Sequence, residues 1–391
     1  MAPLLKIYNP LLKRKKNILY YEPSLGFGGS TSALASIVNN LNRGFFYPIV
    51  IVKNFGSQMQ KIKDTEIIKL RNYKEKSKLS NSEYLYYFIK NIIPEVIKLY
   101  FIIRRKRISL VHVNTNINMG IPVILAAKLA RIPCVCHIRE TRKLIQKEKA
   151  LTKLVNKFIV LNNNALELYK YDISEDKLSI IYDGIDLEEF NNTSTSEFRK
   201  EYNLNSNPLI GVVGRIVKGK GQKEFILSAK GVLKFYPHAK FLIVGEAKGG
   251  DDSYYKEIQS LVNQENLDKC IIFTGWRNDI KNIISAIDVF VFTSTTYPEG
   301  LPNAIIEAMA LKKPVVSTNV PGPRDIVIDK ETGFLVPTGD IEAMSDRINH
   351  LLGDREIYQK MAEAGRKRVE ELFDIKKNVR KIEDLYKRVL S

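Results

Sequence analysis

The stretch that decides the fold is Val289–Ser317, VFVFTSTTYPEGLPNAIIEAMALKKPVVS. It begins with the apolar run VFVF and continues through a loop that contains two prolines and a glycine. The segment 303–311 then has the composition of a helix, and a second apolar run follows at 314–317. Short apolar runs that alternate with amphipathic segments are typical of a parallel sheet covered by helices on both faces. The stretch therefore predicts a strand, a loop, a helix and a second strand of an α/β domain.

The same alternation runs through the chain in two blocks, and a length of 391 residues suits two domains. The predicted strands are 17–22, 47–52, 110–114, 134–138, 157–161, 209–213, 241–244, 271–273, 289–292 and 314–317. The predicted helices are 31–41, 82–107 with an interruption at Pro94, 121–131, 222–234, 254–263, 303–311, 341–352 and 376–390. A polar stretch at 186–207, with NNTSTS at 191–196, is typical of a linker or an exposed loop. The predicted domains are therefore residues 1–195 and 196–374.

The composition argues against a membrane-spanning protein, a secreted protein and a metal-binding protein. The sequence contains no run of about 18 uncharged apolar residues, and no apolar core with a cleavage site follows its basic start, so we expect neither a spanning helix nor a secretory signal. The three cysteines, Cys134, Cys136 and Cys270, have no metal-binding spacing. They are expected to be buried, reduced thiols in a cytoplasmic protein without a metal site.

The positive charge is concentrated in the first half of the chain. Residues 1–190 hold 31 Lys and Arg against 16 Asp and Glu, which is +15 of the net +18. This excess indicates either an anionic partner or a solvated, lysine-rich surface. The clusters KRKK at 13–16 and RRKR at 104–107 fit an anionic bilayer, and the apolar helix before residue 104 either touches lipid or packs on the sheet. Neither cluster contains aromatic residues, which argues against a nucleic-acid partner.

The deciding stretch also carries two candidate binding residues. Glu299 lies in the loop, and Glu307 lies about one turn inside the predicted helix. Ligands of open α/β sheets bind beyond the carboxyl ends of the strands. A carboxylate there accepts bonds from vicinal hydroxyls, while the backbone N–H groups of 300–303 at the helix start favour a phosphate. Glu307 stands among apolar residues, which argues against a merely solvated face.

Two glycine-rich loops follow the first strand of each block. GRIVKGKG at 214–221 brackets its cations with glycines, so Arg215 and Lys220 are candidates to neutralise a diphosphate; the alternative is a flexible basic loop. LGFGGS at 25–30 leads into a helix and is either a phosphate-binding turn or an ordinary one.

These motifs together resemble a retaining glycosyltransferase of family four, with the GT-B fold. The resemblance covers nearly the whole chain and rests on GRIVKGKG at 214–221, IYDGIDLEEF at 181–190, FTGWRNDI at 273–280, PEGLPNAIIEAMALKKPVV at 298–316 and TGFLVP at 332–337. It implies two Rossmann-like domains facing across a cleft, with a C-terminal helix, 375–391, that crosses back to the first domain.

The resemblance also implies roles for individual residues. Arg215 and Lys220, with Gly214, would hold the donor diphosphate, and Glu307 would bind the ribose. Glu299 would lie by the donor sugar, as would the backbone of Gly300, Leu301 and Asn303. Trp276, Arg277 and Asn278 would pass the base, and Gly28 and Gly29 would border the phosphate from the opposite domain. His137 would lie near the transferred sugar.

Other positions are less tied to chemistry. His112 is expected to be structural, and Arg139 and Glu140 are candidates for the acceptor side by adjacency to His137. The family often has a glutamate where this chain has Asp325, which shortens the reach of that carboxylate.

The expected activity is metal-independent transfer of a hexose from a nucleotide-diphosphate sugar, with UDP favoured over GDP and no cofactor. The catalytic set would be His137, Glu299, Arg215 and Lys220. Retention would follow either from a Glu299 nucleophile or, as we favour, from front-face attack. The acceptor would be a lipid-linked or growing surface glycan, and the enzyme would be peripheral on the inner face of the cell membrane. The alternatives are a sugar-nucleotide epimerase, a phosphorylase and a non-catalytic binding subunit.

Overall fold

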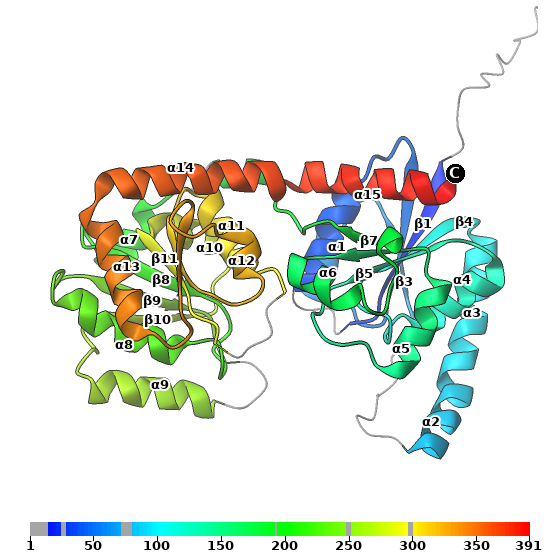
Figure 1. Cartoon of the computed structure of the whole chain (residues 1–391), viewed down its shortest axis with the longest axis horizontal. Coiled ribbons are helices and arrows are strands. Elements are labelled where there is room, and N and C mark those ends of the chain that lie inside the picture. The colour runs from blue at the N-terminus through cyan, green and yellow to red at the C-terminus, as the bar shows by residue number, and fades with distance from the viewer. Residues whose placement is uncertain (1–14, 25–28, 72–79, 192–193, 248–251, 296–299) are drawn as a thin grey trace, which may run out of the picture. The chain divides into compact units, whose positions relative to one another are not determined.

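The computed structural model (Figure 1) describes residues 15–24, 29–71, 80–191, 194–247, 252–295 and 300–391. The chain divides into two compact units. Unit 1 comprises Met1–Val160, Ala165–Ile181 and Val379–Ser391, and unit 2 comprises Leu161–Asn164 and Tyr182–Asn378. Among the described residues, every helix is too short or too polar to cross a membrane.

Unit 1 is built on a seven-stranded parallel sheet of order β3-β2-β1-β4-β5-β6-β7. Its strands are β1 Lys16–Glu22, β2 Phe46–Val52, β3 Glu66–Lys69, β4 Ile108–Val113, β5 Cys134–Ile138, β6 Lys157–Val160 and β7 Leu178–Ile180. Its helices are α1 Gly29–Asn40, α2 Asn81–Tyr87, α3 Ile93–Arg105, α4 Ile121–Ala130, α5 Gln146–Leu151 and α6 Asn163–Tyr169, together with most of α15 Ile375–Leu390.

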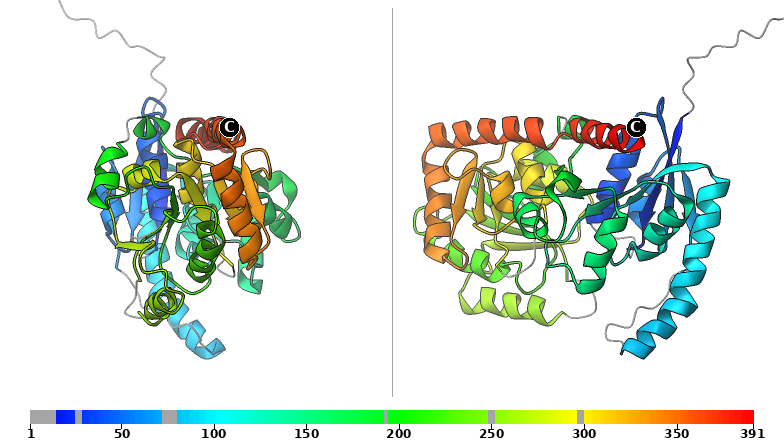
Figure 2. Two further views of the ribbon diagram at one scale, coloured as in Figure 1. Left: turned by 90° about the vertical axis from the view of Figure 1, so that its left-hand side faces the viewer. Right: turned by 45° about the vertical axis from the view of Figure 1, so that its right-hand side comes forward.

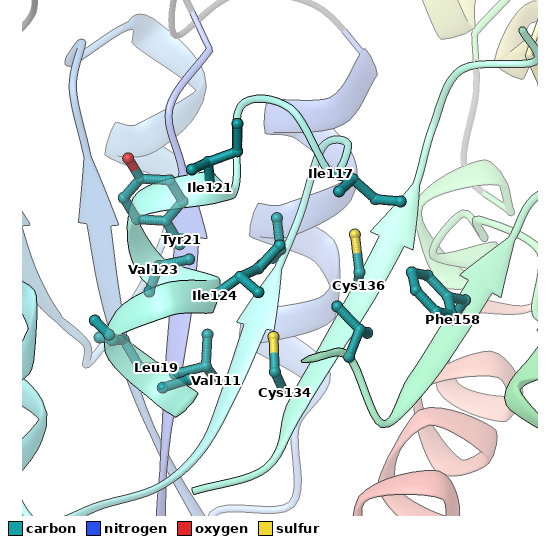
Figure 3. Packing of buried hydrophobic residues seen from close by; sticks show 14 of the residues in the cluster. Leu19, Tyr21, Val111, Ile117, Ile121, Val123, Ile124, Cys134, Cys136 and Phe158 are labelled. Carbon is teal, nitrogen blue, oxygen red and sulfur yellow. The ribbon is translucent and has the colours of Figure 1, made fainter. Parts of the chain in front are cut away.

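One face of this sheet forms a continuous apolar core. Figure 3 shows α4 residues Ile121 and Ile124 packed over the strands, beside Val111 of β4 and the thiols of Cys134 and Cys136 on β5. All three cysteines are buried and free of disulfides. Burial raises the pKa of the Cys134 thiol to about 12, so the thiol stays protonated. A structural role, as expected from the sequence, is therefore consistent with their surroundings.

Unit 2 has a six-stranded parallel sheet of order β10-β9-β8-β11-β12-β13. Its strands are β8 Leu209–Val213, β9 Lys240–Val244, β10 Ile271–Gly275, β11 Val289–Phe292, β12 Val315–Thr318 and β13 Gly333–Val336. Its helices are α7 Ser196–Glu201, α8 Gln222–Leu233, α9 Ser253–Gln264, α10 Ile280–Ala286, α11 Asn303–Ala310, α12 Pro323–Ile326, α13 Ile341–Gly353 and α14 Arg355–Leu372. Separate apolar clusters on its two faces, one with α8 and α13 and one with α10 and α11, give the sheet the double cover that the sequence predicts.

The unit boundaries fall at other residues than the expected 195 and 375. Ile185 exchanges backbone hydrogen bonds with Phe373 and Ile375, which ties the segment after β7 to unit 2. Asn163 donates to the carboxylate of Asp325, which places Leu161–Asn164 in unit 2 as well. Long-range pairings of this kind leave no local mark in the composition.

Helices α2 and α3 form one rod at the edge of unit 1 (Figure 1 and Figure 2). The sequence predicts an interruption at Pro94, whereas the structure has a π-helical turn at Phe88–Ile92 and places Pro94 in the first turn of α3. A proline has no N–H to donate to the preceding turn, and the π-helical turn changes the hydrogen-bond pattern of the helix directly before it. The expected interruption is therefore a change of helix type rather than a break.

Each sheet has a point at which its strand order reverses. In unit 1 the chain runs outward from β1 through β2 and β3 on one side and from β4 through β7 on the other. In unit 2 the same reversal lies between β8 and β11. Loops that leave two such neighbouring strands diverge and open a crevice at the carboxyl edge, where ligands of doubly wound sheets bind.

Candidate functional site

The loop Gly214–Gly221 leaves β8 at the reversal point of unit 2. Backbone hydrogen bonds from Gly214 to Val244 and from Ile216 to Glu246 hold its first half against the end of β9. Gln222 donates its side-chain amide to the carbonyl of Arg215 at 2.9 Å. These bonds attach the loop to the end of β9 and to the first residue of α8.

The second half of this loop is fastened to the segment that leads from β11 to α11. The hydroxyl of Thr293 donates to the carbonyl of Lys220 at 2.8 Å, and the backbone N–H of Thr295 donates to Gly219 at 2.8 Å. Gly221 has φ +77°, and a Cβ there would lie 1.8 Å from the carbonyl oxygen of Thr293. Only glycine fits such a close approach with a positive φ. The structure therefore holds Gly219, Lys220 and Gly221 against the end of β11.

Helix α11 begins at Asn303, as predicted, and Glu307 lies half-buried about one turn inside it. Its apolar neighbours Ile305, Ile306 and Ala308 are fully buried. Their packing in the core fixes the rotation of α11 about its axis and therefore the direction of the Glu307 side chain. Gly300, Leu301 and Asn303 are half-buried at the helix start. Glu299 lies outside the described residues.

The stretch after β10 is placed at the same edge of the sheet. Trp276 is 57% exposed and Asn278 is exposed, so both can meet a ligand. The guanidinium of Arg277 is held by two carboxylates, Glu201 at 2.8 Å and Asp279 at 2.8 Å. Nothing in the local sequence identifies Glu201 as a partner, and these two ion pairs hold the side chain of Arg277 in the loop.

At the reversal point of unit 1, a polar cluster joins the ends of three strands. The amide of Asn114, directly after β4, donates to the carboxylate of Glu22 at the end of β1, and Arg139, directly after β5, donates to the side-chain and backbone oxygens of Asn114 at 2.9 to 3.3 Å. Burial raises the pKa of Glu22, which is only 1% exposed. Gly29 starts α1 nearby in sequence, and Gly28 lies outside the described residues.

His137 lies beside this cluster on β5. Its Nδ1 is 3.3 Å from the guanidinium of Arg139 and its side chain is fully buried. Burial, together with the Arg139 charge, lowers the pKa of His137 well below its usual value, so the ring is neutral at pH 7. Arginine only donates, so Nδ1 must accept and the ring proton must sit on Nε2.

His112, whose ring centre lies 5.7 Å from that of His137, contacts the last helix. Its Nδ1 lies 2.5 Å from the phenol oxygen of Tyr386, which also bonds to Tyr20 at 3.1 Å. All three side chains are buried. Because Tyr386 belongs to α15, this contact fastens the last helix to the sheet of unit 1.

The ring proton of His137 gives a direct test of the cluster. In protein labelled with 15N-histidine, we expect the His137 ring to be the Nε2–H form, identified among four histidines by its loss in His137→Gln. Arg139→Met removes the donor to Nδ1 and is expected to shift the ring toward a mixture of tautomers, whereas Arg131→Met, an exposed arginine after α4, leaves it unchanged. A ring that carries its proton on Nδ1 in the wild type would contradict the assignment.

Glu22 and Asn114 are functional candidates that the sequence motifs do not single out. Both end an apolar run, NILYYE and LVHVN, with a polar residue. A buried polar group at the carboxyl end of a parallel strand is the signal that would have found them.

The chain matches two known protein families and is similar in sequence to glycosyltransferases of other organisms. Residues 70–189 match the family described as Glycosyltransferase Family 4, and residues 194–368 match Glycosyl transferases group 1. The chain is 31% identical over 310 residues to the UDP-Gal:alpha-D-GlcNAc-diphosphoundecaprenol alpha-1,3-galactosyltransferase of Escherichia coli, over 74% of this chain and 78% of that one. It is 33% identical over 224 residues to the capsular polysaccharide biosynthesis glycosyltransferase CapM of Staphylococcus aureus, over 56% and 57% of the two chains.

Solved structures agree on the fold. A glycosyltransferase from Rickettsia africae aligns with a TM-score of 0.83 at 23% identity, over 97% of this chain and 99% of that one. The protein HepE of Anabaena, solved in complex with UDP, aligns with a TM-score of 0.81 at 21% identity, over 95% and 100%. Both likenesses support the GT-B fold, with two Rossmann-like units that are each built on a parallel sheet.

Proposed function

Because this chain belongs to glycosyltransferase family 4 and has the GT-B fold, we propose that it transfers a hexose from a UDP-sugar to a lipid-linked or growing surface glycan. The observation that carries the donor site is the fixed loop Gly214–Gly221, joined through Thr293 and Thr295 to the segment before α11 at the reversal point of unit 2. UDP is favoured because one relative is named for UDP-Gal and a neighbour with the same fold was solved in complex with UDP.

In this proposal each residue of unit 2 acts on one part of the donor. Arg215 and Lys220 neutralise the diphosphate, which lets the reaction proceed without a metal ion. Glu307 accepts bonds from the ribose hydroxyls, and Trp276 and Asn278 flank the base. Glu299 and the backbone N–H groups of Gly300, Leu301 and Asn303 meet the sugar.

We propose that the reaction proceeds by front-face attack. The acceptor oxygen bonds to the anomeric carbon as its bond to the diphosphate breaks, and the leaving phosphate takes the proton of the acceptor hydroxyl. In this proposal His137, neutral and with its proton on Nε2, lies near the transferred sugar and does not act as a base. The product then keeps the anomeric configuration of the donor, which proton NMR of the product reads directly; an inverted product would contradict this mechanism.

The acceptor part of the proposal draws on the same relatives. The Escherichia coli relative is named for a diphosphoundecaprenol acceptor and the Staphylococcus aureus relative for capsular polysaccharide. Together with the +15 net charge of residues 1–190, this supports a lipid-linked acceptor and peripheral association with the inner face of the cell membrane.

Nucleotide binding is the first test. UDP at 100 times its dissociation constant is expected to stabilise the protein by about 2.7 kcal/mol, and GDP and ADP less. Glu307→Ala removes a charged hydrogen-bond acceptor and is expected to weaken UDP binding by about 1.5–3 kcal/mol, roughly 10- to 100-fold. Thermal unfolding with each nucleotide measures both effects.

The control variant is Glu342→Ala, which removes an exposed glutamate in α13 of the same unit and should leave the UDP effect intact. If UDP does not stabilise the wild type, or stabilises both variants equally, the donor site proposed here is wrong.

A further inference from the structure

A row of large apolar side chains lies exposed along the rod formed by α2 and α3. We call it the apolar stripe: Leu85, Ile89, Ile93, Ile97 and Phe101, which are between 40 and 63% exposed, with Tyr86 beside them at 64%. Exposed apolar residues scattered singly need no explanation, but a contiguous set indicates a binding surface.

The stripe is not the result of a poorly packed helix. The opposite face of α3 buries Val96, Leu99 and Ile103 in the core of unit 1. Glu95 on that face is also buried, where it accepts a bond from the Tyr21 hydroxyl at 2.6 Å and pairs with Lys53 at 3.0 Å. The helix therefore has two apolar faces, one used by the fold and one turned to solvent.

The spacing of the stripe is four residues throughout. In a regular α-helix a step of four residues advances about 400°, so such a row drifts around the helix by about 40° per step. The π-helical turn Phe88–Ile92 has more residues per turn and counteracts that drift in the middle of the row. The helix type therefore keeps the exposed residues nearer to one side of the rod than a regular α-helix would.

The exposed charges beside the stripe are mostly positive. Glu83 in the first turn of α2 is exposed and Glu95 is buried, whereas the exposed cations between residues 84 and 107 are Lys90, Lys98, Arg104, Arg105 and Arg107. Each cation near an anionic bilayer contributes attraction, and an amphipathic helix of this composition lies in the interface with its apolar side chains among the lipids. A second copy of the chain would bring the same cations against each other.

We propose that the apolar stripe, with its flanking cations, is the surface by which unit 1 docks on an anionic bilayer. This proposal rests on the proposed function in one respect only: docking would hold the enzyme at the membrane in which a lipid-linked acceptor is embedded. The docking itself is a property of the chain without substrate. The helix lies along the membrane plane, with the buried face still packed on the sheet of unit 1.

The test is co-sedimentation of the full chain with vesicles of phosphatidylcholine alone or mixed with phosphatidylglycerol. We expect binding to the mixed vesicles, and we expect Ile97→Gln with Phe101→Gln to lower the partition coefficient about 10- to 100-fold. The matched controls Leu129→Gln in α4 and Phe235→Gln in unit 2, which are 62 and 71% exposed, should bind as the wild type does. Arg104→Gln with Arg105→Gln should lose binding to the mixed vesicles at low salt.

Three outcomes would overturn the docking surface: unchanged binding by the stripe variant, equal binding of the wild type to both kinds of vesicle at low salt, or a dimer of the wild type that the stripe variant turns into a monomer in light scattering. UDP stabilisation of each variant is measured in parallel. Because that reading does not involve vesicles, a failed donor site and a failed docking surface give different results.

Discussion

Replacing Lys220 with alanine is expected to lower kcat/KM about 10²–10³-fold, since removing one group that stabilises developing charge typically costs that much. In the proposed reaction, negative charge grows on the diphosphate as its bond to the sugar breaks. The Lys220 ammonium lies 5.7 Å from the centre of the Phe292 ring, next to the segment that leads to α11. The interaction strengthens as the charge grows, so kcat is expected to fall along with kcat/KM.

Lys220→Ala is expected to leave the backbone of the loop in place. The hydrogen bonds that fix the loop use the backbone carbonyls of Gly219 and Lys220, so losing the ammonium leaves them in place. Lys218→Ala removes an exposed cation of the same loop and is the matched control, with an expected loss below about 3-fold. Initial rates of sugar transfer, with thermal unfolding to verify the fold, give the comparison. Equal losses in the two variants would mean that the general positive charge of the loop, and not Lys220, serves the donor.

Acidification below pH 6.5 is expected to destabilise unit 1 through its buried histidines. Burial lowers the pKa of His112 to about 3 and that of His137 well below its usual value. Both depressed values mean that the unfolded chain, with histidine near pH 6.5, binds protons that the folded chain does not. The stability that the two neutral histidines contribute is therefore fully present above pH 6.5. It is lost as the pH falls toward their pKa values in the folded chain, by about 1.4 kcal/mol per pH unit for each histidine.

Urea unfolding at pH 7.0, 6.0 and 5.0 measures this slope. His112→Gln is expected to remove about half of it whatever its own stability, and His350→Gln, an exposed residue of α13, to leave it unchanged. Glu22 and Glu383 act in the opposite direction because burial raises the pKa of both carboxyls. They are present in every variant, so they cancel in the comparison. If His112→Gln leaves the pH dependence of the unfolding free energy unchanged, protonation of the His112 ring does not cause the loss of stability.

The sequence predicts those features that depend on local pattern. The buried strands β1, β4, β5, β8 and β11 stand out as apolar runs, and the start of α11 at Asn303 follows from the proline before it. The sequence does not single out β3, β7 and β13. In β3 (EIIK) and β7 (LSI) polar residues flank or interrupt the apolar ones, whereas β11, which is as short as β3, is apolar throughout.

Some residues of the candidate site can be predicted from local sequence motifs, and others cannot. Arg215, Lys220 and Glu307 can be picked out because each stands in a short motif that follows a strand. The cluster of Glu22 with Asn114 joins residues 92 positions apart, and the contact of His112 with Tyr386 joins residues 274 apart. Pairings of this kind depend on the strand order, which a single sequence does not specify.

The contact of Tyr386 with His112 also bears on how the chain is made. Proteins emerge from the ribosome from their N-terminus, and domains generally fold in that order. Here the sheet of unit 1 lacks the side chain that closes its polar interior until residue 386 has been synthesised. All seven strands of unit 1 are complete at residue 180, and unit 2 ends at residue 378. Unit 1 therefore has its whole sheet early but gains this last buried contact only when the chain is almost finished.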